Sequence, residues 1–139
     1  MLLSGEGVES GKLSDAEAYD VFKQGLDQED LDGKRVLVLM PDDTRSCPLP
    51  MLFRNLVDVI SPRVAKVDFL IALGTHQPMK EEKILGMLGL TPEERATTYK
   101  DVGLFNHEWN KEGTFADLGA IPPGRIAEIT GGLMEEEVR

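Results

Sequence analysis

The chain has 139 residues, of which 41% are hydrophobic and 29% charged, a balance typical of one globular domain. The formal net charge of −10 argues against nucleic acid or an anionic membrane as a partner. The single cysteine, Cys47, excludes an internal disulfide, and no apolar stretch reaches the ~20 residues of a membrane-spanning helix. The first six residues carry no basic region, so we expect no signal peptide and a cytoplasmic protein.

The N-terminal part of the chain is acidic. Residues 1–32 hold nine acidic and two basic side chains, a net charge of −7, which predicts a solvated face. Residues 1–13 are rich in glycine and serine, which predicts a loosely ordered N-terminal segment. Ser14 and Glu17 form a capping box, which predicts a helix over 15–24 that ends at Gly25.

Two apolar runs, 36–40 and 66–73, predict neighbouring strands joined by a helix. Because the first run is continuously apolar, we expect helices to bury both of its faces. Strand, helix and strand within about 40 residues predict a βαβ unit with parallel strands. The connecting helix is predicted from two prolines at its start and apolar residues at helical spacing: Pro48, Pro50, Leu52, Leu56, Val59 and Ile60.

Further elements follow in the same alternating order, so we expect a single α/β domain over 1–139, Rossmann-like and three-layered, with a mainly parallel sheet. The predicted elements are a helix over 79–88 that ends at Gly89, a short helix from the capping box Thr91–Glu94 to about Tyr99, a strand over 102–106, and extended pieces at 114–118 and 125–130.

Polar side chains follow both strands of the predicted βαβ unit. Asp42, Asp43 and Arg45 come after the first strand, and Thr75 and His76 after the second. In parallel sheets, ligands bind beyond the carboxyl ends of the strands, and neighbouring strands lie only ~4.8 Å apart. We therefore expect the two loops to face one crevice.

Several of these residue types suit chemistry. Arg45 offers a planar fork for a carboxylate or phosphate, or an ion pair with an adjacent aspartate. His76 suits a general base, or a loop histidine bonded to backbone. His107 has a simple structural neighbour in Glu108, and Cys47 has no adjacent base and predicts a packed thiol.

The two loops together resemble the N-terminal domain of the lactate racemase family. The stretch Asp42–Arg45 stands where that family has Asp-His-Thr-Arg, and Ala72–Met79 contains its Gly-Thr-His. The helix that begins near 80–82 and the stretch Phe105–Trp109 also match, and the resemblance covers roughly residues 33–132.

The resemblance implies a two-domain α/β isomerase that interconverts the stereoisomers of a small 2-hydroxy acid, with a nickel pincer nucleotide as hydride acceptor. Carried over to this chain, Arg45 would bind the substrate carboxylate, with Thr44 and Thr75 beside it. Asp42 would support the site, and His76 would act as general base on the substrate hydroxyl.

Three departures from the family bear on function. Asp43 replaces the usual histidine, Ser46-Cys47 replaces the usual Pro-Thr, and Gln77 stands where the family often has arginine or another residue, so the preferred 2-hydroxy acid is open. The family's second catalytic histidine, cofactor-bearing lysine and nickel-binding histidine lie in a later region. We therefore expect this chain to be one wall of a site, completed by a C-terminal domain, and inactive alone.

Two other readings remain open from the residues. A receiver-like or phosphatase-like domain would use Asp42 and Asp43 to hold Mg²⁺. Such a site requires another acidic residue or a lysine at the end of the neighbouring strand, where this chain has Gly74-Thr75-His76. A non-enzymatic interaction module would instead use the acidic N-terminal face.

Overall fold

A computed structural model describes residues 3–139, which fall into two compact units. The first unit extends to Glu108 and holds the sheet, and the second runs from Trp109 to Arg139. No helix among the described residues is long and apolar enough to cross a membrane.

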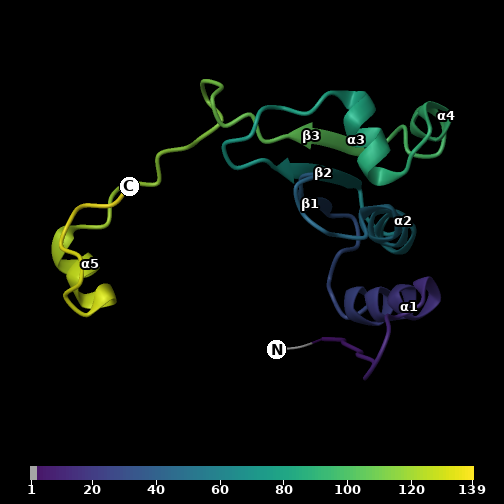
Figure 1. Ribbon diagram of the computed structural model, residues 1–139, viewed down its shortest axis with the longest axis horizontal. Helices are drawn as coiled ribbons and strands as arrows, with labels where there is room; N and C mark the ends of the chain where they lie inside the picture. The colour runs from purple at the N-terminus through teal and green to yellow at the C-terminus, as the bar shows by residue number, and fades with distance from the viewer. Residues whose placement is uncertain (1–2) are drawn as a thin grey trace. The chain divides into compact units, whose positions relative to one another are not determined.

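The first unit is built on a three-stranded parallel sheet, which confirms the α/β class and the mainly parallel sheet (Figure 1). Helix α2 connects the first two strands, as the βαβ pattern predicted. The strands lie in the order β1-β2-β3, with bounds β1 Arg35–Pro41, β2 Lys66–Ala72 and β3 Gly103–Asn106.

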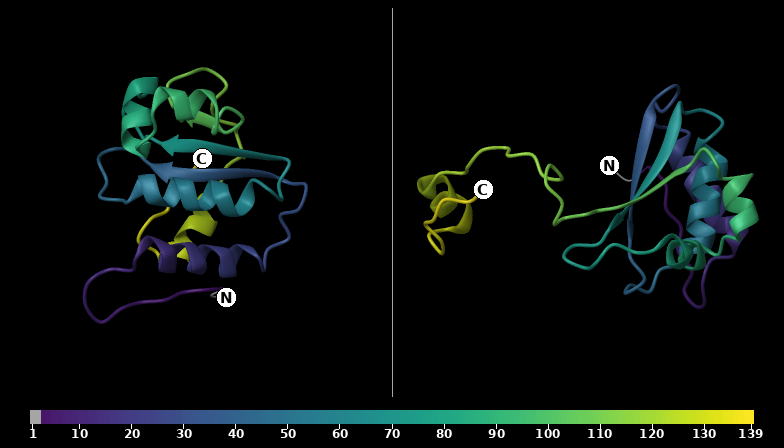
Figure 2. Two further views of the ribbon diagram at one scale, coloured as in Figure 1. Left: turned by 90° about the vertical axis from the view of Figure 1, so that its right-hand side faces the viewer. Right: turned by 90° about the horizontal axis from the view of Figure 1, so that it is seen from above.

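Helices cover one face of this sheet (Figure 2). On that face Phe69 and Ile71 of β2 are fully buried, and the ring of Phe53 in α2 lies 4.8 Å from the ring of Phe69. Burial of these large side chains is the main source of stability of the unit. The helices of this layer are α1 Asp15–Leu26, α2 Leu49–Ile60, α3 Glu81–Leu88 and α4 Pro92–Ala96.

The opposite face of the sheet is exposed within this unit. Leu37 and Leu39 of β1 and Phe105 of β3 are 57%, 67% and 49% exposed. The prediction that both faces of the first strand are buried is therefore wrong for this unit, because its helices all lie on the side of Val36, Val38 and Met40. Residues 3–108 supply two of the three expected layers.

The first helix begins as predicted and ends later. The backbone and hydroxyl of Ser14 each lie 2.7 Å from the Glu17 carboxylate, so the capping box is confirmed. The predicted end at Gly25 is wrong, because the helix continues to Leu26. The ion pair Lys23–Asp27, at 2.7 Å, holds the last turn together.

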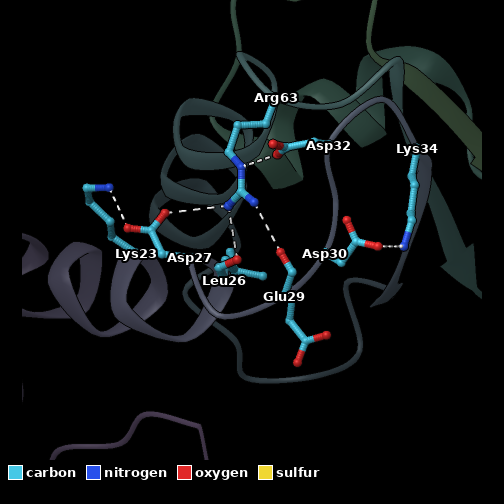
Figure 3. A network of polar contacts seen from close by, with 8 residues as sticks. All are labelled: Lys23, Leu26, Asp27, Glu29, Asp30, Asp32, Lys34 and Arg63. Atoms are coloured by element: carbon cyan, nitrogen blue, oxygen red, sulfur yellow. Dashed lines mark hydrogen bonds and ion pairs between the residues drawn. The ribbon is translucent and has the colours of Figure 1, made fainter.

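The acidic segment that follows is folded around one guanidinium (Figure 3). Arg63 donates to an Asp32 carboxylate oxygen at 2.7 Å and to the carbonyls of Leu26 and Glu29 at 3.1 and 3.0 Å. Asp27 lies 3.5 Å from the same group. These contacts fix the segment at the amino end of the sheet, before β1 and β2 begin.

The later elements match the predictions in part. Gly89 ends α3 with φ +62°, as predicted, and the Thr91 capping box is present, although its helix ends at Ala96. The predicted extended piece at 125–130 is wrong. Residues Pro123–Thr130 form helix α5, because prolines open it and Gly131 closes it in the left-handed conformation. Residues 114–118 form no strand.

Candidate functional site

The two predicted loops meet at the carboxyl ends of β1 and β2. An open cavity of about 470 Å³ lies there, with apolar walls that include Leu39 and Ala72. The cavity is lined by all five residues that the resemblance assigns to the site, namely Asp42, Thr44, Arg45, Thr75 and His76, whereas Asp43 does not line it. A larger cavity of about 620 Å³, beside α3 and α4, contains none of them.

A buried carboxylate joins the two loops. Asp42 is only 5% exposed, and one of its oxygens lies 2.5 Å from His76 Nδ1. Its other oxygen accepts from the Thr44 backbone N–H at 3.1 Å and from the Thr44 hydroxyl at 2.5 Å. The Asp42 pKa falls to about 2, first because of the Thr44 hydroxyl and then because of His76.

The ionised state of Asp42 sets the tautomer of His76. An ionised carboxylate can only accept hydrogen bonds, so His76 Nδ1 carries the proton that it donates to Asp42. In the neutral ring, Nε2 then keeps its lone pair. The His76 side chain is 58% exposed, so it is accessible to solvent for proton transfer.

Local backbone geometry places both loops. After β2, Gly74 has φ +59°, and the His76 N–H donates to the Leu73 carbonyl at 2.9 Å. Only glycine adopts this conformation without strain, so the tight turn after β2 depends on it. After β1, the Asp42 carboxylate bonded to the Thr44 N–H makes the equivalent turn.

Arg45 lines the cavity and is exposed. Within the part of the chain that the structure describes, its guanidinium makes no hydrogen bond or ion pair. The alternative of an ion pair with a neighbouring aspartate is therefore not observed. Thr75 is likewise exposed and lines the same cavity.

The two aspartates of the first loop have different partners. Asp43 lies 2.8 Å from Lys83 of α3, whereas Asp42 binds Thr44 and His76. A magnesium site needs converging oxygens, so this arrangement does not favour the receiver-like or phosphatase-like reading. Across residues 3–139, no three His, Cys, Asp or Glu side chains lie close enough together to hold a metal ion by themselves.

The remaining candidates lie outside the cavity, and one residue of this edge was missed. The His107 backbone N–H donates to Ile71 at 3.1 Å, and Cys47 is half-buried against the core. Asn106, at the end of β3, makes two hydrogen bonds to Met79 in the loop after His76. Two signals could have found it: its position at a strand end and its place in the stretch Phe105–Trp109 that matches the family.

Comparison with known proteins supports the resemblance. The family described as the lactate racemase N-terminal domain matches residues 20–138. A crystal structure of a protein from Thermotoga maritima superposes with a TM-score of 0.72 at 28% identity, covering 95% of this chain and 30% of that chain. This chain thus spans under a third of that protein, and no curated protein matches it.

The family match continues across the boundary between the two compact units at Glu108 and Trp109. The expectation of a single domain over residues 1–139 stays a prediction. The matched segment includes both site loops, β3 and α5. The chain therefore belongs to the lactate racemase N-terminal domain family.

Proposed function

We propose that this chain is the substrate-binding N-terminal part of an isomerase that interconverts the stereoisomers of a small 2-hydroxy acid. The observation that carries the proposal is the pairing of ionised Asp42 with His76 in a cavity that Arg45 also lines, the Arg45 guanidinium having no partner within the described chain. A cation and an oriented base that line one cavity match a substrate that carries a carboxylate and a hydroxyl on adjacent carbons.

Arg45 would bind the substrate carboxylate. A guanidinium forms two parallel hydrogen bonds with a carboxylate, which fixes the orientation of the bound acid as well as its position. The Thr75 hydroxyl, whose residue lines the same cavity, would assist, whereas the Thr44 hydroxyl donates its one proton to Asp42 and would support the site through that carboxylate. This contact determines which carbon of the substrate faces the base and so aligns the reacting groups.

His76 would accept the proton of the substrate hydroxyl at Nε2. Asp42, held ionised by Thr44, would stabilise the imidazolium that forms. Loss of this proton lets the carbinol carbon become a carbonyl carbon as a hydride departs. Return of the hydride to the opposite face, and of a proton to the oxygen, yields the other stereoisomer.

The hydride acceptor would come from outside this chain. A nickel pincer nucleotide, which the family resemblance implies, would supply hydride chemistry when bound. We assign its attachment and its nickel-binding histidine to a C-terminal domain, because the resemblance places both residues in a later region and this chain covers only 30% of the similar Thermotoga maritima chain. The chain alone is then one wall of the site and should not racemise a 2-hydroxy acid.

The test is racemisation of a single enantiomer of lactate and of larger 2-hydroxy acids by the complete, cofactor-loaded enzyme, followed by chiral chromatography. His76→Gln should lower kcat by about 10²- to 10⁴-fold, the contribution of a positioned general base. His107→Gln is the matched control and should lower it less than about tenfold, since His107 lies outside the cavity. Undiminished activity in His76→Gln, or racemisation by the 139-residue chain alone, would refute the proposal.

A further inference from the structure

The side chain of Asn106 clamps a loop that belongs to a different strand. Its Oδ1 accepts from the Met79 backbone N–H at 2.9 Å, and its Nδ2 donates to the Met79 carbonyl at 2.9 Å. One amide thus satisfies both backbone polar groups of a single residue, as a neighbouring strand would.

Met79 needs such a partner because of where it lies. It is buried, at 8% exposed, but β2 has ended at Ala72 and α3 begins only at Glu81. Neither a strand ladder nor a helix therefore serves its backbone groups. Buried backbone groups without partners are costly, so the Asn106 amide determines where this part of the loop can lie.

The same loop carries His76 between two fixed points. At its start, the His76 N–H is bonded to the Leu73 carbonyl. At its end, Met79 is held by Asn106. Only Gln77 and Pro78 separate His76 from Met79. Pro78 restricts its own backbone and that of Gln77 before it. A shift of Met79 is therefore passed to His76.

We propose that Asn106 is a positioning residue that holds the His76 imidazole against Asp42 by clamping Met79. The three strands of the sheet then each supply one part of the site: the carboxylate after β1, the base after β2 and the clamp at the end of β3. The inference depends on the proposed function only for what His76 does in the reaction.

A merely structural asparagine would behave differently. Its removal would lower the stability of the unit but leave the contact between His76 and Asp42 unchanged. A positioning residue changes that contact in a protein that remains folded. The readouts are therefore the tautomer of His76 and the titration of Asp42, both of which NMR measures directly.

The test compares Asn106→Ala and Asn106→Leu with the matched control Asn55→Ala in the 139-residue chain. Asn55 is also half-buried, but it lies on α2, and among residues 3–139 its amide makes a hydrogen bond to Met51 alone. In the wild type and the control, the imidazole nitrogens should show the Nδ1–H tautomer. In the Asn106 variants this preference should weaken, and the Asp42 pKa should rise from about 2 toward 3.8.

In the complete enzyme, the Asn106 variants should lower kcat by about ten- to hundredfold, with a smaller change in KM, because misplacement of a catalytic group affects the chemical step. An unchanged tautomer and Asp42 titration in folded Asn106 variants would overturn the proposal. Unfolding of both variants, or an equal change in Asn55→Ala, would overturn it too. If the Asn106 variants show a weaker preference for the Nδ1–H tautomer but the complete wild-type enzyme racemises no 2-hydroxy acid, the positioning role of Asn106 is upheld and only the proposed function is refuted.

Discussion

Two arginines at opposite ends of the same sheet have opposite surroundings. At the amino end, the Arg63 side chain is 26% exposed, and its guanidinium contacts two aspartates and two backbone carbonyls. At the carboxyl end, Arg45 is exposed and has no hydrogen-bond or ion-pair partner for its guanidinium among residues 3–139. Arg45 follows polar residues and Arg63 follows a proline, both in loops. The sequence alone therefore does not show which of the two arginines binds a ligand.

The difference shows how a structural arginine is told from a binding one. The donors of Arg63 are used within the chain, where they hold the acidic segment in place (Figure 3). The donors of Arg45 are unused within the described residues, although Asp42 and Asp43 are close in sequence. Those aspartates are occupied by His76 and Lys83, which leaves Arg45 available for an external carboxylate.

The largest expected effect separates the two arginines by activity. In the complete enzyme, Arg45→Met should lower kcat/KM for a 2-hydroxy acid by about 10²- to 10³-fold, because a charge-assisted contact to the substrate is lost. Arg63→Met should leave the activity per folded molecule within about twofold. Steady-state kinetics with both variants checks this, and equal losses in the two variants would break the comparison.

The second effect separates them by stability. Arg63→Met should lower the free energy of unfolding by about 1–3 kcal/mol, because hydrogen bonds to a charged group are lost and the acidic segment is released. Arg45→Met should change it by less than about 0.5 kcal/mol, as expected of an exposed side chain. Urea denaturation followed by circular dichroism measures both, and a larger loss in Arg45→Met would contradict the assignment.

The third effect concerns acid. The pKa values of Asp42 and Glu94 are both lowered to about 2, the first mainly by the Thr44 hydroxyl and the second mainly by Arg54. Between about pH 5 and about pH 2 the unfolded state binds these protons first, so the free energy of unfolding should fall as the pH falls.

Urea denaturation across this pH range should show a shallower fall in both Asp42→Asn and Glu94→Gln. Only Asp42→Asn should also reduce racemisation, because Glu94 lies outside the cavity at the carboxyl ends of β1 and β2. A steeper pH dependence in either variant would contradict the sign of its pKa shift.

The smallest effect concerns the aspartate that replaces the family's histidine. Lys83→Met removes the partner of Asp43 and exposes its negative charge near Arg45. KM for an anionic substrate should rise about two- to fivefold at low salt and less at high salt, as for an exposed ion pair. Asp43→Asn in the same background should restore KM. An unchanged KM of Lys83→Met at low salt would show that the charge of Asp43 is too far from the substrate to affect its binding.

The sequence was sufficient to place the two loops at one edge, because the βαβ connectivity brings the carboxyl ends of β1 and β2 together. It could not predict the contact between Asp42 and His76, which depends on side-chain directions across 34 residues. The clamp from Asn106 to Met79, across 27 residues, was missed for the same reason.

The layers of the sheet show a different limit. A continuously apolar strand predicts burial on both of its faces, but the pattern does not show which elements bury each face. Within the first unit, Leu37 and Leu39 stay exposed, whereas Met40 is buried. In α5, the β-branched Ile126, Ile129 and Thr130 favoured a strand, and the proline and glycine at its ends outweighed them.

The most direct test of the site is a crystal structure of the complete enzyme with an unreactive 2-hydroxy acid analogue. The account predicts a carboxylate bound by two Arg45 nitrogens at about 2.7–2.9 Å, with the substrate hydroxyl facing His76 Nε2. A carboxylate bound away from Arg45, or a hydroxyl facing away from His76, would contradict it.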